Sequence, residues 1–525
     1  MTDNQAAAIP ASDVPAGPRR EILIVLPGLL LTLIIAMLDQ LVVSTALPRI
    51  VGDLGGLNHL AWVVTAYILA STVTTLFYGK LGDMYGRKRF LMIAIVIFLI
   101  GSALSGLAHS MDQLIAFRAL QGLGAGGLMV GAIATIGDMV SPRERGQYMG
   151  YMMAAMMVAM IAGPLVGGYI TQNWSWRWIF YINMPIGGAA MVYLWATLHL
   201  PRKRVEHKID YLGAAVIATF STAIILLTSW GGSQYAWGSW EILMLAGISA
   251  ASLGAFFVVE SRAAEPMLPL HVFKNRNFTL ASAMSLLLGM AMLGAMTFLP
   301  LFQQTVQHAS PTGSGLMLIP LMLGSTATSL ISGRVTSKTG RYKILPVIGA
   351  VIMTLGIYLL THIGVGTTRL TTAIFFVVLG IGMGFLMQIT SLIAQNSVPQ
   401  QDMGVASSSR SFFQQIGGSL GVSLFGVVFF TKFSATVTSL LHTRASVGGS
   451  GANLDPATIN SLPAAVRNAA FEGISHAISS VFWWTIPATV AVFVLALFVK
   501  EIPLRGRIEP STPQLEPERE LVHGT

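Results

Sequence analysis

The 525-residue sequence has no cysteine and few charged residues. Without cysteine the chain cannot form disulfides, thiolate metal sites or a thiol nucleophile. It also contains no GxxxxGK(S/T) segment, so nothing in it predicts a phosphate-binding loop for ATP. Only 10% of the residues are charged and 54% are apolar, against about 25% and roughly 45–50% in an average soluble domain. These absences exclude a soluble enzyme and favour a membrane protein that is not driven by bound ATP.

Long apolar runs are what the sequence has in abundance. A helix needs about 20 apolar residues to cross the roughly 30 Å hydrocarbon core of a bilayer. Fourteen such runs predict an all-α integral membrane protein with fourteen transmembrane helices. The runs lie near residues 22–47, 58–78, 90–108, 112–137, 147–171, 177–199, 211–229, 241–259, 278–301, 313–333, 343–362, 370–394, 404–431 and 479–499.

Lysine and arginine are distributed unevenly between the segments that join these runs. With both termini placed in the cytoplasm, 23 of the 31 basic residues fall in inner segments and six in outer ones. An excess of basic residues on the cytoplasmic side is typical of membrane proteins. The net charge of +9 is therefore a topology signal, and no nucleic-acid partner is expected.

An internal repeat divides the chain. The inner loop from Gly79 to Arg89 reads GKLGDMYGRKR, and the one from Gly333 to Lys343 reads GRVTSKTGRYK, at an offset of 254 residues. Because this offset spans eight helices, it fits two six-helix bundles with an inserted helix pair, and parallel repeats of this kind place a substrate site between the halves. The expected organisation is a disordered cytoplasmic tail at 1–20, an N-terminal bundle at 21–200, the inserted pair at 201–262, a C-terminal bundle at 263–502 with a spacer-like outer loop at 433–478, and a second cytoplasmic tail at 503–525.

Several segments, spread over nearly the whole membrane body, resemble the major facilitator superfamily and its drug:proton antiporter branch with fourteen helices. Besides the loop at Gly79, they are LDQLVVSTALPRI from Leu38, WVVTAYILA from Trp62, RALQGLGAGG from Arg118, GPLVGG from Gly163, WRWIFYINMPIG from Trp176 and QNSVPQQDMGVASS from Gln395.

This resemblance implies the major facilitator fold and alternating access, with proton entry driving the export of amphipathic drugs or metabolites. It further implies a protein of the bacterial cytoplasmic membrane that functions as a monomer. No cofactor is expected, since protons are the coupling ion. The ten histidines show no ligand-like spacing, so no metal is expected either.

Two features depart from the branch pattern. Gln414 stands where an arginine is frequent, while Arg410 lies one turn earlier, and the role of Arg410 stays open. Asp402 is the only acid between Glu265 and Asp455, which argues against several coupling sites in the later helices.

Asp39 is the only one of the 22 acids that lies well inside an apolar run. A buried carboxylate is costly unless it is paired or protonated, so such a residue is a functional candidate. Arg118 is the candidate partner, because both residues lie roughly 10–12 Å from the outer ends of their helices at 1.5 Å per residue. In the functional interpretation Asp39 binds a proton outside, releases Arg118 or cargo, and unloads the proton inside. The alternative is a static ion pair between two helices.

The inner loop at Gly79 is predicted to act as a gate. Its glycines permit close helix ends and positive φ, and its charged residues can pair across helix ends. We expect Asp83 to form a latch that holds the inner side closed; the alternative is a basic anchor with a tight turn. The gating residues are Gly79, Gly82, Asp83, Gly86, Arg87, Lys88 and Arg89, with Asp138, Glu144 and Arg145 as candidate partners.

The run at 147–171 combines methionines with a glycine motif on one helical face. The motif is Gly163, Pro164, Gly167 and Gly168, which the resemblance implies is an antiporter mark that packs across the interface between the halves. The methionines fit either a deformable cargo wall or plain packing. The candidate cavity residues are Met153, Met156 and Met160, together with Trp62, Tyr67 and Gln388, and Asn183 is a further polar point that fits a cavity wall or an interhelical hydrogen bond.

The function predicted from these features is proton-driven efflux. The alternatives are an importer or a lipid or metabolite transporter of the same fold, and a membrane receptor that does not transport. An intramembrane enzyme is not expected, because no histidine or second acid lies at the depth of Asp39.

Overall fold

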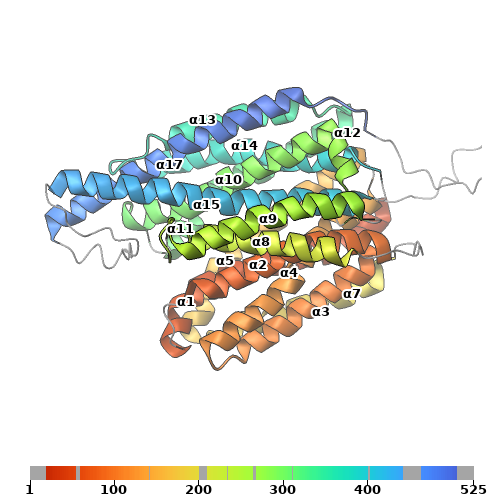
Figure 1. Cartoon of the computed structure of the whole chain (residues 1–525), viewed down its shortest axis with the longest axis horizontal. Helices are drawn as coiled ribbons and strands as arrows, with labels where there is room; N and C mark the ends of the chain where they lie inside the picture. Colours follow the sequence, from red (N-terminus) through yellow and green to blue (C-terminus); the bar gives the residue numbers. More distant parts are fainter. Residues whose placement is uncertain are drawn as a thin grey trace, which may run out of the picture.

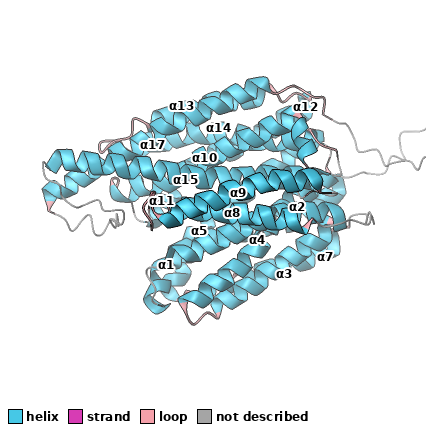
Figure 2. Ribbon diagram, viewed as in Figure 1, coloured by secondary structure: helices cyan, strands magenta, loops and turns pink. Residues whose placement is uncertain are grey.

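A computed structural model describes residues 19–54, 60–140, 142–199, 210–232, 234–263, 266, 268–309, 311–399, 402–441 and 463–504. These residues form helices, with no β-sheet among them (Figure 2). Thirteen helical segments in this part of the chain are long and apolar enough to cross a membrane, and one further apolar helix has 17 residues. Together they correspond to the fourteen predicted spans.

The first six spans form the N-terminal half. The sixth span consists of two helices that meet at Ile182. The elements of this half are α1 (Arg19–Leu54), α2 (Leu60–Tyr85), α3 (Arg87–Gly106), α4 (Met111–Met139), α5 (Pro142–Asn173), α6 (Trp178–Tyr181) and α7 (Asn183–Thr197).

The inserted pair and the C-terminal half follow. The pair is α8 (Tyr211–Trp230) and α9 (Trp240–Arg262), which are packed against each other. The remaining elements are η2 (Leu270–Lys274), α10 (Arg276–Thr305), α11 (Pro311–Leu316), α12 (Ile319–Thr339), α13 (Ile344–Leu360), α14 (Arg369–Asn396), α15 (Met403–Leu441) and α17 (Ala464–Phe498).

Helix ends are set by local sequence. Ser110 and Asp210 begin α4 and α8, where each side chain accepts a hydrogen bond from the backbone N–H three residues on. Such caps satisfy donors that the first helical turn leaves free. Gly86 alone separates α2 from α3 and has φ 102°, a conformation that favours glycine. This turn brings the basic residues after Gly86 directly to the start of α3.

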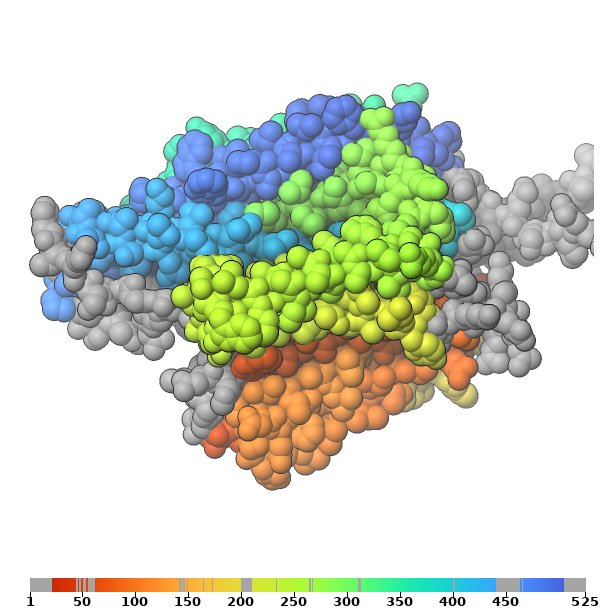
Figure 3. Space-filling view, in the orientation of Figure 1, coloured from red at the N-terminus to blue at the C-terminus, as the bar shows by residue number. Residues whose placement is uncertain are grey.

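The halves meet along two seams. Helix α2 packs along α15, and α5 packs along α12. Figure 1 shows the N-terminal half in red to orange and the C-terminal half in green to blue, with α8 and α9 between them. The inserted pair follows the first seam, because α8 contacts both α2 and α15. In the space-filling view α8 and α9 form a continuous band between the halves (Figure 3).

Each half has its own apolar core, and a smaller cluster joins the inserted pair to both. Phe98 lies fully buried in the N-terminal core, and Phe278 and Phe376 lie in the C-terminal one. The joining cluster includes Leu76 of α2 and Phe412 of α15 with members of α8 and α9. The inserted pair, α8 and α9, is therefore packed against both halves.

Three predicted segments differ from the structure. Residues Gly79 to Tyr85 were expected in a loop but form the last turns of α2, and residues Gly333 to Thr339 of the second inner loop likewise form the last turns of α12. The expected outer loop at 433–478 is partly helical, since α15 continues to Leu441 and α17 begins at Ala464. The tail at 1–20 lies outside the described residues except for the first two residues of α1, and the tail at 503–525 lies outside them from residue 505 on.

Candidate functional site

A buried charged pair joins α1 to α4. The Nη1 atom of Arg118 lies 2.6 Å from a carboxylate oxygen of Asp39, and the two side chains are 1% and 0% exposed. The structure thus brings together the two residues that the sequence nominated from their matching depth. Because neither side chain reaches solvent, the charges must satisfy each other and their neighbours.

Two amides complete the network around Asp39. Gln121 Nε2 donates to Asp39 at 2.8 Å, and Asn183 Nδ2 donates to it at 2.7 Å. Arg118 Nη1 also donates to Gln121 Oε1 at 2.7 Å. Every partner of Asp39 in this network is therefore a donor, an arrangement that suits an ionised carboxylate, which only accepts.

Tyr67 lies between this network and the centre of the molecule. Its ring faces the Arg118 guanidinium, with Cζ 4.1 Å from the ring centroid, and its hydroxyl donates to the Ala36 carbonyl at 3.4 Å. Tyr67 and Ala36 both line the central cavity, as does Gln40, the residue after Asp39. The charged pair is consequently one side chain away from the cavity.

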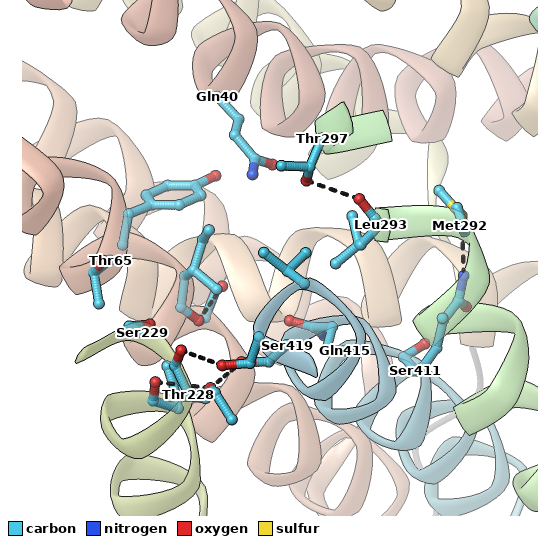
Figure 4. A pocket seen from close by; sticks show the side chains of 18 of the residues that line it. Gln40, Thr65, Thr228, Ser229, Met292, Leu293, Thr297, Ser411, Gln415 and Ser419 are labelled. Carbon is cyan, nitrogen blue, oxygen red and sulfur yellow. Dashed lines mark hydrogen bonds between the residues drawn. The ribbon is translucent and has the colours of Figure 1, made fainter. Parts of the chain in front are cut away.

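The central cavity has a volume of about 1030 Å³ and lies between the halves. Its walls come from α1, α2, α4 and α5 on one side and from α10, α14 and α15 on the other, with α8 closing the seam between α2 and α15. Figure 4 shows Gln40 and Thr65 facing Thr297, Gln415 and Ser419 across this space. Most of the lining is apolar, as expected of a site for amphipathic molecules.

Four of the six candidate cavity residues line this space, namely Met153, Met156, Tyr67 and Gln388. Met160 does not, because it packs on the core of the C-terminal half. Trp62 does not either, since its ring packs edge-to-face on Trp230 of α8 at 5.4 Å. For these two residues the structure replaces the predicted lining role with packing.

The residues predicted to gate include a contact between the halves. Asp83 accepts hydrogen bonds from the backbone N–H groups of Gly404 and Val405, at 3.1 and 2.9 Å, at the start of α15. Its carboxylate also pairs with Arg87. An acid at a helix N-terminus satisfies free N–H groups and the positive end of the helix dipole. Asp83 therefore ties α2 to α15 as the latch interpretation expects.

Arg87 extends the latch within the N-terminal half. Its Nε lies 2.5 Å from Asp138 at the end of α4, which is one of the three candidate partners. Glu144 lies in the first turn of α5, and the side chain of Arg145 is outside the described residues. The remaining basic residues differ from one another. Lys88 donates to the Trp195 carbonyl at 2.7 Å, whereas the expected contact of Arg89 is not found, because its side chain is exposed.

A second contact layer lies between the latch and the cavity. Thr72 Oγ1 donates to Gln415 Oε1 at 2.8 Å, which joins α2 to α15 across the seam. Two turns further along α2, a Cβ at Gly79 would collide with Ser408, so glycine permits the close approach there. Gly82 is less constrained, as a Cβ there would make only an ordinary contact with Arg87. These contacts hold α2 against α15 between Asp83 and the cavity.

The glycine motif of α5 packs differently from the prediction. A Cβ at Gly163 would collide with Leu41 of α1, so this glycine serves packing within the N-terminal half instead of across the interface. Gly167 accepts a hydrogen bond from Thr171, and a Cβ at Gly168 would meet nothing within 4 Å. Elsewhere along α5, Gly150 faces Leu330 of α12, and α5 also contacts α11 and α14 of the other half. The side chain of Pro164 is outside the described residues.

Sequence reasoning missed some of the polar residues at the site. Gln121 lies three residues after Arg118, so the helical period could have placed both on one face. Asn183 was left open between a cavity wall and an interhelical bond, and the structure places it on Asp39. Nothing in the sequence indicated that Arg410 and Gln415 face the cavity.

Comparison with known proteins gives a consistent family. The sequence pattern described as the Major Facilitator Superfamily matches residues 29–422. Multidrug resistance protein 3 of Bacillus subtilis is 34% identical over 92% of this chain and 96% of its own length. Multidrug transporter protein MdtP of the same organism is 36% identical over 80% of this chain and 77% of its own length.

Two solved structures share the fold. The proton:xylose symporter XylE has a TM-score of 0.61 at 13% identity, covering 90% of this chain and 95% of that one. The human organic anion transporter MFSD10 has a TM-score of 0.59 at 12% identity, covering 91% and 99%. At this identity the likeness concerns the arrangement of helices alone.

Proposed function

The chain belongs to the Major Facilitator Superfamily, and we propose that it exports amphipathic small molecules in exchange for protons. As a member of a transporter family it is not an enzyme. The observation that carries the proposal is the buried pair of Asp39 and Arg118. Tyr67 packs on Arg118 and lines a cavity of about 1030 Å³. Relatives named multidrug transporter and multidrug resistance protein support the cargo class.

The hydrogen bonds of Asp39 support proton coupling. Its carboxylate accepts from Arg118, Gln121 and Asn183. A proton on either oxygen would place a hydroxyl donor against other donors, so the network would have to rearrange. Arg118 would lose its counter-charge, and Tyr67, which stacks on it, would move in the cavity wall. Proton binding and cargo binding would thereby compete through one side chain.

Alternating access is supported by contacts that join the two halves at one end of the cavity. The Asp83 bonds and the Thr72–Gln415 contact lie toward the end where α2 meets α3. The cavity lining continues past the end of α8 to Gly232 and along α15 to Thr431, whereas α15 itself ends at Leu441. Opening the latch while the opposite end closes would transfer cargo across the membrane, and the proton on Asp39 would bias that exchange.

The latch end is proposed to face the cytoplasm. Asn277, near the start of α10, binds the Lys500 backbone, and Asn275 binds Ser397 shortly before α15. The basic segments after α2, α9, α12 and α17 therefore share one end of the bundle, as the excess of inner basic residues requires. We place both termini in the cytoplasm of a bacterial cell, with the protein acting as a monomer in the cytoplasmic membrane.

Reconstituted vesicles test the proposal directly. The full chain is placed in vesicles that are acidic inside, and an amphipathic fluorescent dye is added outside. An antiporter accumulates the dye as protons leave. Accumulation only with acid outside would indicate symport and overturn the proposed direction of coupling.

Asp39→Asn tests the coupling site in the same vesicles. The change keeps the shape of the side chain and removes the titrating group, so gradient-driven accumulation should fall to the background of empty vesicles. Downhill exchange of labelled for unlabelled dye should persist, because the cavity is intact. Asp53→Asn is the matched control. Asp53 lies in the last turn of α1, away from the Asp39 network, and accepts a hydrogen bond from Trp176. An Asn at position 39 that transports at the wild-type rate would refute the coupling role.

A further inference from the structure

We propose that the cavity selects amphipathic anions, with the acidic head group bound to Arg410. This inference rests on the proposed export function and names the substrate class of the same cavity. Arg410 is the only formally charged residue among those that line the cavity in the described part of the chain. The other polar lining residues in this part of the chain are neutral hydroxyls, amides and an indole, so no acidic side chain among them could pair with a cationic head group.

The guanidinium of Arg410 is held by one neutral contact. Nη1 donates to Gln414 Oε1 at 3.0 Å, one turn further along α15. The residue is 7% exposed, and its Nε has no hydrogen-bond partner. A buried cation with an unused donor is costly unless an anion satisfies it. Arginine is also well shaped for this task, because its fork of donors matches carboxylate, sulfonate or phosphate oxygens.

No described acid is positioned to neutralise Arg410. Asp402 lies eight residues earlier on the chain, about 12 Å away along a helix at 1.5 Å per residue. One of its carboxylate oxygens lies 3.6 Å from Nε2 of His271. Asp39 is bound to Arg118, and Asp83 is bound to Arg87 and to the start of α15. The charge of Arg410 therefore remains available to a ligand.

The rest of the cavity suits the apolar part of such a ligand. From Arg410 to Thr431 the lining follows α15 for about 30 Å at 1.5 Å per residue. Phe429 and Phe430 line the part furthest from Arg410, and Met292 and Met387 line it elsewhere. A molecule with an acidic head and an aromatic or aliphatic body would place charge and apolar surface against matching parts of the wall.

A matched pair of probes separates charge from shape. The anion 1-anilinonaphthalene-8-sulfonate and neutral N-phenyl-1-naphthylamine share one aromatic skeleton and differ by the sulfonate. Calorimetry on the purified full chain in lipid nanodiscs, with empty nanodiscs subtracted, gives both dissociation constants. The wild-type protein should bind the sulfonate about tenfold or more tightly than the neutral probe, as one charge-assisted contact implies.

Variants of α15 localise the effect. Arg410→Gln should weaken sulfonate binding about ten- to a hundredfold while leaving neutral binding unchanged. Gln414→Glu should do the same with Arg410 retained, because the new carboxylate would occupy the guanidinium at the present 3.0 Å contact. Lys432→Gln, an exposed position of α15 outside the lining, is the charge-matched control and should change neither affinity.

The result that would overturn this proposal is equal wild-type affinity for the two probes. Equal weakening of both probes by Gln414→Glu would also overturn it, since that pattern indicates packing instead of charge. Binding requires no proton gradient. A protein that binds the sulfonate selectively but shows no gradient-driven transport would refute the export proposal and leave this one standing.

Discussion

The two halves share one helix arrangement and differ in where they bury charge. In the N-terminal half, Asp39 and Arg118 form a buried ion pair between α1 and α4. At the repeat offset of 254 residues, the C-terminal half has Leu293 and Thr372 instead. Thr372 accepts a neutral hydrogen bond from Gln307 at 2.9 Å. The corresponding helices of the C-terminal half are therefore joined without an ion pair, which agrees with the proposed coupling role of Asp39 and Arg118.

The latch segments show the same contrast. Both copies have a glycine with positive φ at the eighth position, Gly86 at 102° and Gly340 at 71°. Only the first copy has an acid, Asp83, which reaches across to α15. The second copy has Ser337 at the corresponding position, and its Arg341 is exposed. The shared glycines thus preserve the turn between helices, whereas the latch belongs to one half.

Replacing the polar residue by an apolar one at each of the two corresponding positions, Arg118 and Thr372, should give the largest difference between the halves. Arg118→Leu leaves Asp39 buried without its counter-charge and should lower the free energy of unfolding by about 3–5 kcal/mol. The C-terminal counterpart, Thr372→Val, loses a neutral hydrogen bond and should cost about 1 kcal/mol. Equilibrium unfolding in mixed micelles measures both.

The double variant sharpens that result. Arg118→Leu combined with Asp39→Asn should recover part of the lost stability, because no unpaired charge remains. If the double variant is as unstable as the sum of the single ones, the two residues contribute independently, and the ion-pair interpretation is wrong.

The latch contrast predicts the next largest effect. Asp83→Asn weakens charge-assisted bonds to α15, so the latch end should open about tenfold more often. The chain has no cysteine, so Ser408→Cys, at the contact of α15 with Gly79, can report this opening by its rate of maleimide labelling. Lys343→Ala in the second copy should leave the labelling rate almost unchanged. Equal acceleration by both changes would contradict a latch in one half only.

The methionine face of α5 predicts a smaller effect. Met153→Leu with Met156→Leu keeps volume and apolarity but stiffens the cavity wall, so bulky substrates should be exported a few-fold less well. Met160→Leu is the control, because Met160 packs on the C-terminal core outside the cavity. Growth inhibition of a drug-sensitive host, over a panel of compounds at matched expression, measures the range. An unchanged range in the double variant would assign these methionines to packing.

The sequence predicted the features that depend on local composition. Hydropathy indicates the fourteen spans, and the conformational freedom of glycine permits the turn at Gly86. Depth along a helix made Arg118 the candidate partner of Asp39, and the structure shows the contact. Boundaries were less accurate where polar residues continue a helix past its apolar run, as for Asp83 in α2 and Thr436 in α15. Hydropathy marks where lipid begins and ends, not where a helix does.

What the sequence by itself determined is the set of spanning helices, because a helix in lipid must satisfy its backbone hydrogen bonds internally and so depends on its own residues. Only the tertiary structure decided which face of each helix lines the cavity. Met156 and Met160 lie one turn apart in α5, yet only Met156 lines the cavity. That difference arises from the helices packed around α5, which are far away in sequence. The placement of Arg410 in the cavity wall has the same origin.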